Sequence, residues 1–167
     1  MIYDPALLDA IEGLPVADWR GRVWRHMFND YTPDRVNTSG ARWNPPGVGA
    51  IYTALQRRTA VESTRVVYDG PGERVLYKVE VSVFELVDLT GSGALAAVCL
   101  TIDDVHADDL KACQRVGGAV AWLERGGLLV PSARDPDSNL VILVGRLGLD
   151  DDLVVVEREV VEDRGTA

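Results

Sequence analysis

Cysteine and histidine are scarce in this sequence. The 167 residues include two cysteines, Cys99 and Cys113, and two histidines, His26 and His106. The cysteines lack the paired spacing of a metal site or a redox motif, and two isolated histidines are too few for a metal centre. We therefore expect no metal ion, and we expect both cysteines to be reduced thiols in the core.

Long apolar runs and glycine-rich phosphate-binding motifs are absent as well. No 18 apolar residues follow one another without a charge, and the N-terminus has no basic start followed by an apolar run. There is no P-loop and no G-x-G-x-x-G motif, and a turn explains the fragment Gly47-Val48-Gly49. We expect a soluble, cytoplasmic protein that does not insert into a membrane.

Positive charge is in deficit. The chain has 17 lysines and arginines against 26 aspartates and glutamates, which gives a net charge of -9 and a sequence pI near 4.6. This balance disfavours nucleic acid as a direct partner. The acidic residues concentrate late in the chain, so a locally positive pocket formed by its early, arginine-rich part is compatible with it.

Length and composition predict a single domain over residues 1–167. With 47% hydrophobic and 26% charged residues, the chain resembles ordinary globular proteins. Hydrophobic patterns predict helices at 4–11, from 103 or 104 to 115 and at 119–125, and strands at 21–26, 50–52, 75–83 with a kinked continuation over 84–89, 128–131, 140–144 and 153–161. Gly117-Gly118 is expected to interrupt the second helix. This irregular order predicts an α+β fold with small mixed or antiparallel sheets and flanking helices.

The stretch 40–62, GARWNPPGVGAIYTALQRRTAVE, combines more unusual chemistry than any other part of the chain. Two prolines and a glycine predict a tight corner, and a short strand and a helix opening at a Thr59-x-x-Glu62 capping box follow. We expect Arg42, Tyr52 and Glu62 to project toward one cleft from three successive elements. A cation, an aromatic face and a carboxylate suit a ligand that carries phosphate and a flat cationic ring.

Each of these residues also has a purely structural explanation. The capping box would occupy Glu62, and Tyr52 would be a half-buried strand aromatic. Arg42 would form a surface ion pair, and Ser132 would be a turn hydroxyl. Arg25 lies on the same strand face as the apolar Val23, so it needs a buried partner.

Taken together, the residues resemble the RES domain, a family named after an arginine, a glutamate and a serine. Three blocks carry the resemblance: VWRHMF with Arg25, GARWNPPGVGAIYTALQRRTAVES with Arg42, Tyr52 and Glu62, and LLVPSARDPDSNLVI with Ser132. The second block is the most specific of the three. The resemblance runs from about Val23 to Val144.

Resemblance to this family implies a fold similar to ADP-ribosyltransferase toxins and an activity that consumes NAD+ as substrate, with no other cofactor. Members are commonly toxins that a partner with an Xre-like helix-turn-helix holds inactive. A homo-oligomer or a larger complex with that antitoxin is compatible with the resemblance. By position, Arg25 and Arg42 would bind the NAD+ phosphates and ribose, Tyr52 would face the nicotinamide, and Glu62 and Ser132 would complete the reaction centre with Arg25.

Three functions follow as hypotheses. The first is an NAD+-degrading toxin that releases nicotinamide and passes ADP-ribose to water or inorganic phosphate. The second is a transferase that attaches ADP-ribose to a protein. The third is an inactive module that binds a nucleotide or a partner peptide and releases no nicotinamide.

Overall fold

Six strands and five α-helices make up the part of the chain that the computed structural model describes, which is residues 2–28, 31–62, 73–133, 136–146 and 153–161. In chain order the elements are α1 (Pro5–Glu12), β1 (Val16–Phe28), β2 (Ala50–Ala54), α2 (Arg57–Glu62), β3 (Arg74–Asp88), α3 (Ala94–Ala97), α4 (Ile102–His106), α5 (Lys111–Trp122), β4 (Gly127–Pro131), β5 (Ser138–Leu143), the 3-10 turn η1 (Val144–Arg146) and β6 (Leu153–Val161). The predicted α+β class is confirmed.

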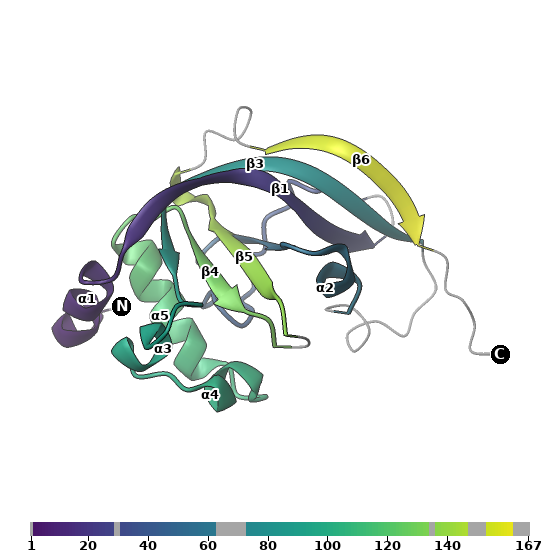
Figure 1. The fold of residues 1–167 in the computed structure, drawn as a ribbon. Coiled ribbons are helices and arrows are strands. Elements are labelled where there is room, and N and C mark those ends of the chain that lie inside the picture. The colour runs from purple at the N-terminus through teal and green to yellow at the C-terminus, as the bar shows by residue number, and fades with distance from the viewer. Residues whose placement is uncertain (1, 29–30, 63–72, 134–135, 147–152, 162–167) are drawn as a thin grey trace.

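The strands form one mixed sheet in the order β1-β2-β5-β4-β3-β6. Because β3 also pairs with β1, the first five strands close on one another. All pairs are antiparallel except β3 with β4. In Figure 1, β1, β3 and β6 arch over β2, β5 and β4, so the long strands form one layer and the short strands another.

A kink lets β3 serve both layers. Its first half pairs with β6, and its last residues, Leu86–Asp88, pair with β4. At the change of partner Glu85 has a φ of 49°, and its N–H donates to the carboxylate of Asp18 at 3.0 Å. The predicted kinked continuation of this strand is confirmed.

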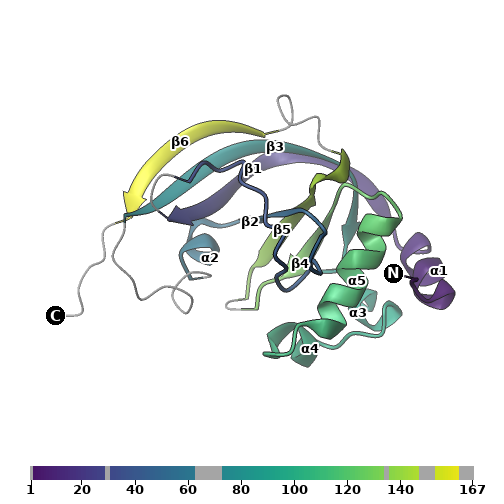
Figure 2. The ribbon, with the colours of Figure 1, turned by 180° about the vertical axis from the view of Figure 1, so that it is seen from behind.

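Helices cover the layers unevenly. Both views place α1, α3, α4 and α5 at one side of the sheet and α2 at the other, beneath the arch (Figures 1 and 2). One buried cluster lies between β2, β4, β5 and the larger helix group, and a second lies among β1, β2, β3 and β5. The helix α2 packs through Ala60 against Ala54 and Leu76.

The helix predictions for residues 103–125 were wrong. In place of one helix from 103 or 104 to 115 and another over 119–125, the structure has α4, which ends at the extended residue Ala107, and α5, which runs from Lys111 to Trp122. The cap of α4 is Thr101, whose Oγ1 accepts from the N–H of Asp104, while the Asp104 carboxylate accepts from the N–H of Thr101. Gly117 and Gly118 do not interrupt α5, where both are buried. They are glycines because the helix lies directly on its neighbours: a Cβ at Gly117 would stand 1.7 Å from the Trp43 carbonyl oxygen.

The thiols differ from each other. Cys113 is buried in α5, but Cys99 is exposed, so the prediction of two core thiols is wrong for Cys99. Among the residues that the structure describes, no group of three histidines, cysteines or carboxylates is placed to hold a metal ion. No described helix is long and apolar enough to cross a membrane.

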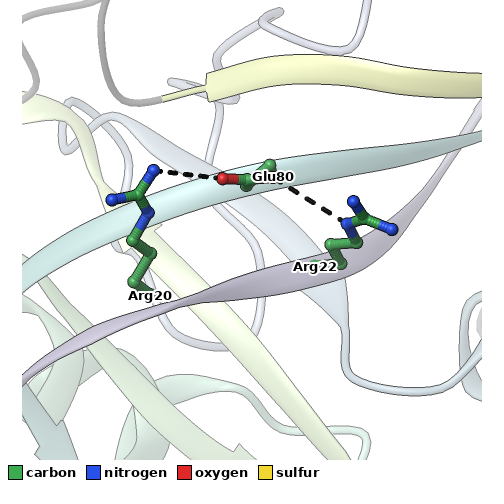
Figure 3. Close-up of polar contacts among 3 residues, drawn as sticks. All are labelled: Arg20, Arg22 and Glu80. Carbon is green, nitrogen blue, oxygen red and sulfur yellow. Dashed lines mark hydrogen bonds and ion pairs between the residues drawn. The ribbon is translucent and has the colours of Figure 1, made fainter.

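The outer face of β1 and β3 carries a small ion-pair cluster. Figure 3 shows Glu80 of β3 between Arg20 and Arg22 of β1, at 3.2 Å and 3.8 Å. All three side chains are solvent-exposed to a large extent, so each pair contributes only about 0–1 kcal/mol to stability. Glu80 is therefore a carboxylate that can be changed with little effect on the fold.

Candidate functional site

The turn at 41–48 is held together by the side chain of Asn44, which is fully buried. Its amide nitrogen donates to the carbonyl oxygens of Asn37 at 3.2 Å and Val48 at 2.7 Å. Its Oδ1 accepts from the Tyr52 hydroxyl at 2.7 Å. The turn and β2 are thus joined by one side chain, and Gly47, with a φ of 93°, closes the predicted corner.

Replacing Asn44 with alanine is expected to lower the free energy of unfolding by about 3 kcal/mol, because three partly buried groups each lose a hydrogen bond, although the Asn37 carbonyl keeps the N–H of Ala50 and the Tyr52 hydroxyl keeps that of Trp43. Chemical denaturation of the two proteins measures the difference. A loss below about 1 kcal/mol would mean that the turn is held in another way.

Tyr52 is fixed at both ends. Its hydroxyl donates to Asn44 and accepts from the backbone N–H of Trp43 at 2.8 Å, while its backbone carbonyl accepts from Arg25. Burial raises the pKa of the Tyr52 phenol above its ordinary value, so the ring is neutral at physiological pH. The structure therefore presents Tyr52 as a rigid aromatic surface rather than as a proton donor.

Arg25 has the buried partners that the sequence required. Its guanidinium donates to the carbonyl oxygens of Tyr52 at 2.9 Å and Arg35 at 2.6 Å, and its Nε contacts the Met27 sulfur at 3.1 Å. Burial lowers the pKa of Arg25 to about 10, which leaves it charged at neutral pH. Arg25 is 8% exposed, and its side chain links β1, β2 and the loop that follows β1.

Tyr52 and Ser132 lie on the same face of the sheet. Trp24, Ala54, Asn139 and Val130 form one row across β1, β2, β5 and β4, because each is paired with the next in register. Tyr52 is two positions from Ala54, and Ser132 is two positions from Val130, so both stand on that face. Tyr52 lies on β2 and Ser132 directly follows the end of β4, so the predicted pair comes from segments far apart in the chain, and Asn139 of β5 lies between these two strands.

Above this face is a cavity of about 380 Å³, which we call the aromatic cavity. Strand residues of the same face supply most of its wall, and the 37–41 loop and α2 supply the rest. Its lining is Trp24, His26, Phe28, Asn37, Ala41, Tyr52, Thr53, Ala54, Ala60 and Asn139. Three aromatic rings beside a histidine and two amides suit a flat ring with polar substituents.

A second cavity of about 350 Å³, which we call the arginine cavity, adjoins the first and shares His26, Phe28 and Asn37 with it. Arg25 and Arg35 line it, and Arg35 stacks on the ring of Tyr31 at 3.6 Å. Two guanidinium groups beside Thr38 and Ser39 suit an anion. The two cavities together match a ligand that carries a flat ring at one end and phosphate at the other.

Glu62 is the last residue of α2, a helix that packs on the β1–β2 side of the site. Neither Glu62 nor Ser132 lines the aromatic or the arginine cavity, although Ala60 of α2 lines the first. The predicted capping box is wrong, because α2 begins at Arg57 and Thr59 lies inside it, buried. A Thr-x-x-Glu pair caps a helix only when its threonine precedes the first turn. The capping box therefore does not explain the presence of Glu62.

Arg42 lies beside Tyr52 but does not line either of these two cavities. It donates to the carbonyl oxygen of Ala107, after the end of α4, at 2.7 Å. The positive charge of Arg42 favours the ionised forms of the Tyr52 hydroxyl and the Cys113 thiol and so acts to lower the pKa of each group. Burial nevertheless raises the pKa of Cys113 to about 11, so this thiol is not a nucleophile at neutral pH.

His26 was not among the predicted site residues, although it follows Arg25 directly and lines both cavities. Its Nε2 accepts from Arg74 Nε at 3.1 Å, and its ring meets Phe28 edge to face. Burial, with the nearby positive charge of Arg74, lowers the pKa of His26 to about 4. The imidazole is neutral at physiological pH.

This shift predicts a loss of stability in acid. The folded protein holds His26 neutral down to about pH 4, whereas the unfolded chain protonates it below about 6.5. Its contribution is therefore present above pH 6.5 and is lost as the pH falls toward 4. Denaturation at pH 7, 5.5 and 4 should show a smaller loss for His26→Gln than for the wild type, and equal losses would contradict the assignment.

Asn44, Arg35, His26 and Asn139 were all missed from the sequence. The RWN block hinted at Asn44, and adjacency to Arg25 hinted at His26. Nothing local marked the other two, because the path of the loop after β1 places Arg35, and the pairing of β5 with β2 and β4 places Asn139.

These features define a mixed α+β domain in which an aromatic cavity and an arginine cavity adjoin each other on one face of the sheet. The family model described as the RES domain matches residues 15–158, and the chain belongs to that family. The predicted resemblance is confirmed and extends beyond both of its predicted ends.

Characterised relatives are similar over most of their length. The NAD(+) phosphorylases MbcT of Mycobacterium bovis and Mycobacterium tuberculosis are each 29% identical over 143 residues, which is 78% of this chain and 77% of theirs. The crystal structure of the M. tuberculosis MbcT–MbcA toxin–antitoxin complex contains a chain that matches with a TM-score of 0.80 at 26% identity, covering 95% of this chain and 93% of that one.

Proposed function

We propose that this protein cleaves the bond between nicotinamide and ribose in NAD+ and passes ADP-ribose to inorganic phosphate. The observation that carries the proposal is the aromatic cavity built on Tyr52 beside the arginine cavity, in a domain of the RES family. The similarity to proteins named NAD(+) phosphorylase supports the same reaction and favours phosphate over water as acceptor.

The substrate would lie across both cavities. The nicotinamide ring would occupy the aromatic cavity, against Tyr52, and the pyrophosphate would extend into the arginine cavity, toward Arg25 and Arg35. Forked guanidinium donors match phosphate oxygens better than lysine does. Arg42 would act from beside Tyr52, where its charge can reach the ribose end of the ligand.

Cleavage here requires little proton transfer. Nicotinamide leaves a cationic linkage as a neutral ring, so no general acid is needed, in contrast to ordinary glycosides with two carboxylates. The carboxylate of Glu62 would hold a ribose hydroxyl and stabilise the positive charge that develops on the ribose, an electrostatic effect worth a few kcal/mol. Ser132 would position the ribose or the acceptor through its hydroxyl, a role that needs no activating base, in contrast to nucleophilic catalysis.

Product analysis tests the proposal. Purified protein incubated with NAD+ and phosphate is expected to release nicotinamide and to form a phosphorylated ADP-ribose, at a rate that rises with phosphate concentration. If the product is free ADP-ribose and its rate of formation does not depend on phosphate, the acceptor is water rather than phosphate. If NAD+ labelled in its ADP-ribose part leaves the label on a protein, the enzyme is a transferase. If nicotinamide is not released at all, the protein does not cleave NAD+.

We also propose that residues 1–167 act as one domain and that a protein antitoxin neutralises it in the cytoplasm. The solved structure that this chain resembles is a toxin–antitoxin complex, which supports a protein partner. An Xre-like helix-turn-helix partner that covers the two cavities would exclude NAD+ most directly. A structure of the pair with both cavities open to solvent would contradict this mode of inhibition.

A further inference from the structure

Two buried polar atoms without a hydrogen-bond partner line the aromatic cavity. Among the described residues, few buried side-chain atoms lack a partner, and two of them are Nδ1 of His26 and Oδ1 of Asn139. Both side chains belong to the wall of this cavity, on either side of β2. A buried polar atom without a partner is costly, so two such atoms at one cavity indicate polar groups on the ligand.

The two atoms have opposite hydrogen-bonding character. His26 is neutral, and its Nε2 accepts from Arg74, so the ring hydrogen is on Nδ1, which is a donor. Oδ1 of Asn139 is an acceptor. The wall of the cavity that Tyr52 lines thus offers one donor and one acceptor.

We propose that His26 and Asn139 bind the carboxamide of nicotinamide, with His26 donating to its carbonyl oxygen and Asn139 accepting from its amino group. A primary amide attached to a flat ring carries both complementary groups at the ring edge. This inference rests on the proposed function, and it makes Asn139 a specificity-determining residue for the substrate.

The matched analogue of NAD+ is the one with 3-acetylpyridine in place of nicotinamide. Its methyl ketone keeps the carbonyl acceptor for His26 but has no N–H for Asn139, and it adds no charge. The wild-type protein is expected to prefer NAD+ in kcat/KM by at least about tenfold, because the analogue leaves the buried oxygen of Asn139 unpaired.

Three variants separate the two contacts. Asn139→Leu should reduce the preference for NAD+ to less than about threefold, because no buried acceptor remains, whereas Asn139→Asp keeps an acceptor and should keep the preference. His26→Phe should lower kcat/KM for both substrates by about tenfold and leave their ratio unchanged, since both carry the carbonyl. A merely structural role for Asn139 would change both substrates alike and leave their ratio as it is in the wild type.

The outcomes distinguish this inference from the proposed function. If the wild-type protein cleaves neither dinucleotide, the proposed function fails. If it cleaves NAD+ but shows no preference for the amide, or if Asn139→Leu retains the full preference, the carboxamide assignment is overturned and NAD+ cleavage stands. Melting curves of the variants confirm that each is folded at the assay temperature.

Discussion

The Glu62→Gln variant is expected to release nicotinamide from NAD+ at least about 100-fold more slowly than the wild-type protein. Glutamine has nearly the same shape as glutamate, but it lacks the negative charge that would oppose the charge developing on the ribose. Because that charge appears mainly in the transition state, the loss should fall on kcat more than on KM. Nicotinamide release in single-turnover conditions measures the step directly.

The control for this variant is Glu80→Gln. It makes the same chemical change at a carboxylate that pairs with Arg20 and Arg22 on the exposed outer face of β1 and β3 (Figure 3). Its activity should equal that of the wild type, and its stability should change by less than about 1 kcal/mol. Undiminished turnover in Glu62→Gln would remove Glu62 from the reaction centre.

The Gly117→Ala variant is expected to lose about 3 kcal/mol of stability or more. Helix propensity alone would favour alanine here by about 1 kcal/mol. The added Cβ, however, would stand 1.7 Å from the carbonyl oxygen of Trp43 and 2.7 Å from its carbonyl carbon, so α5 or the turn must move. The steric clash outweighs the gain in helix propensity, so the variant is less stable. The Trp43 backbone cannot rotate away from the added Cβ as a flexible side chain could.

Activity should fall together with stability in this variant. The N–H of Trp43 donates to the Tyr52 hydroxyl at 2.8 Å, so a displaced Trp43 releases one end of the ring that lines the aromatic cavity. Gly91→Ala is the matched control, since nothing lies within 4 Å of the added Cβ there. Thermal unfolding compares the two, and a Gly117→Ala protein as stable as Gly91→Ala would contradict the packing of α5 on the turn.

The sequence identified the parts of the site that are coded locally. The prolines and Gly47 marked the corner, a short apolar run marked Tyr52 on its strand, and the Val23 side of β1 marked Arg25 as buried. Each of these depends on residues within a few positions, so a single sequence contains the signal. Strand 153–161 was predicted at its observed ends for the same reason.

Long-range packing was out of reach of the same reasoning. Gly117-Gly118 has the composition of a helix break, and only the position of Trp43, in a distant part of the chain, shows why glycine is needed inside α5. The Thr59-x-x-Glu62 pattern matched a capping box, yet the helix started earlier, with the N–H of Ala60 bonded to the carbonyl of Gln56. Local patterns define which residues can cap, but they do not define where packing lets a helix begin.

Asn139 shows the same limit for function. In sequence it is an ordinary polar residue at the start of a strand, and its importance comes from lying opposite Ala54 and Val130 on the face that carries Tyr52. The arginine, glutamate and serine of the family pattern were found by their spacing. The residues that we propose to bind the nicotinamide could be recognised only from the pairing of the strands in the structure.

The central claim is that NAD+ binds across the aromatic and arginine cavities, and a crystal structure of the Glu62→Gln variant with NAD+ tests it most directly. We expect the nicotinamide ring against Tyr52, within hydrogen-bond distance of His26 and Asn139, and the pyrophosphate beside Arg25 and Arg35. A dinucleotide bound on another surface, with both cavities free of it, would contradict the claim.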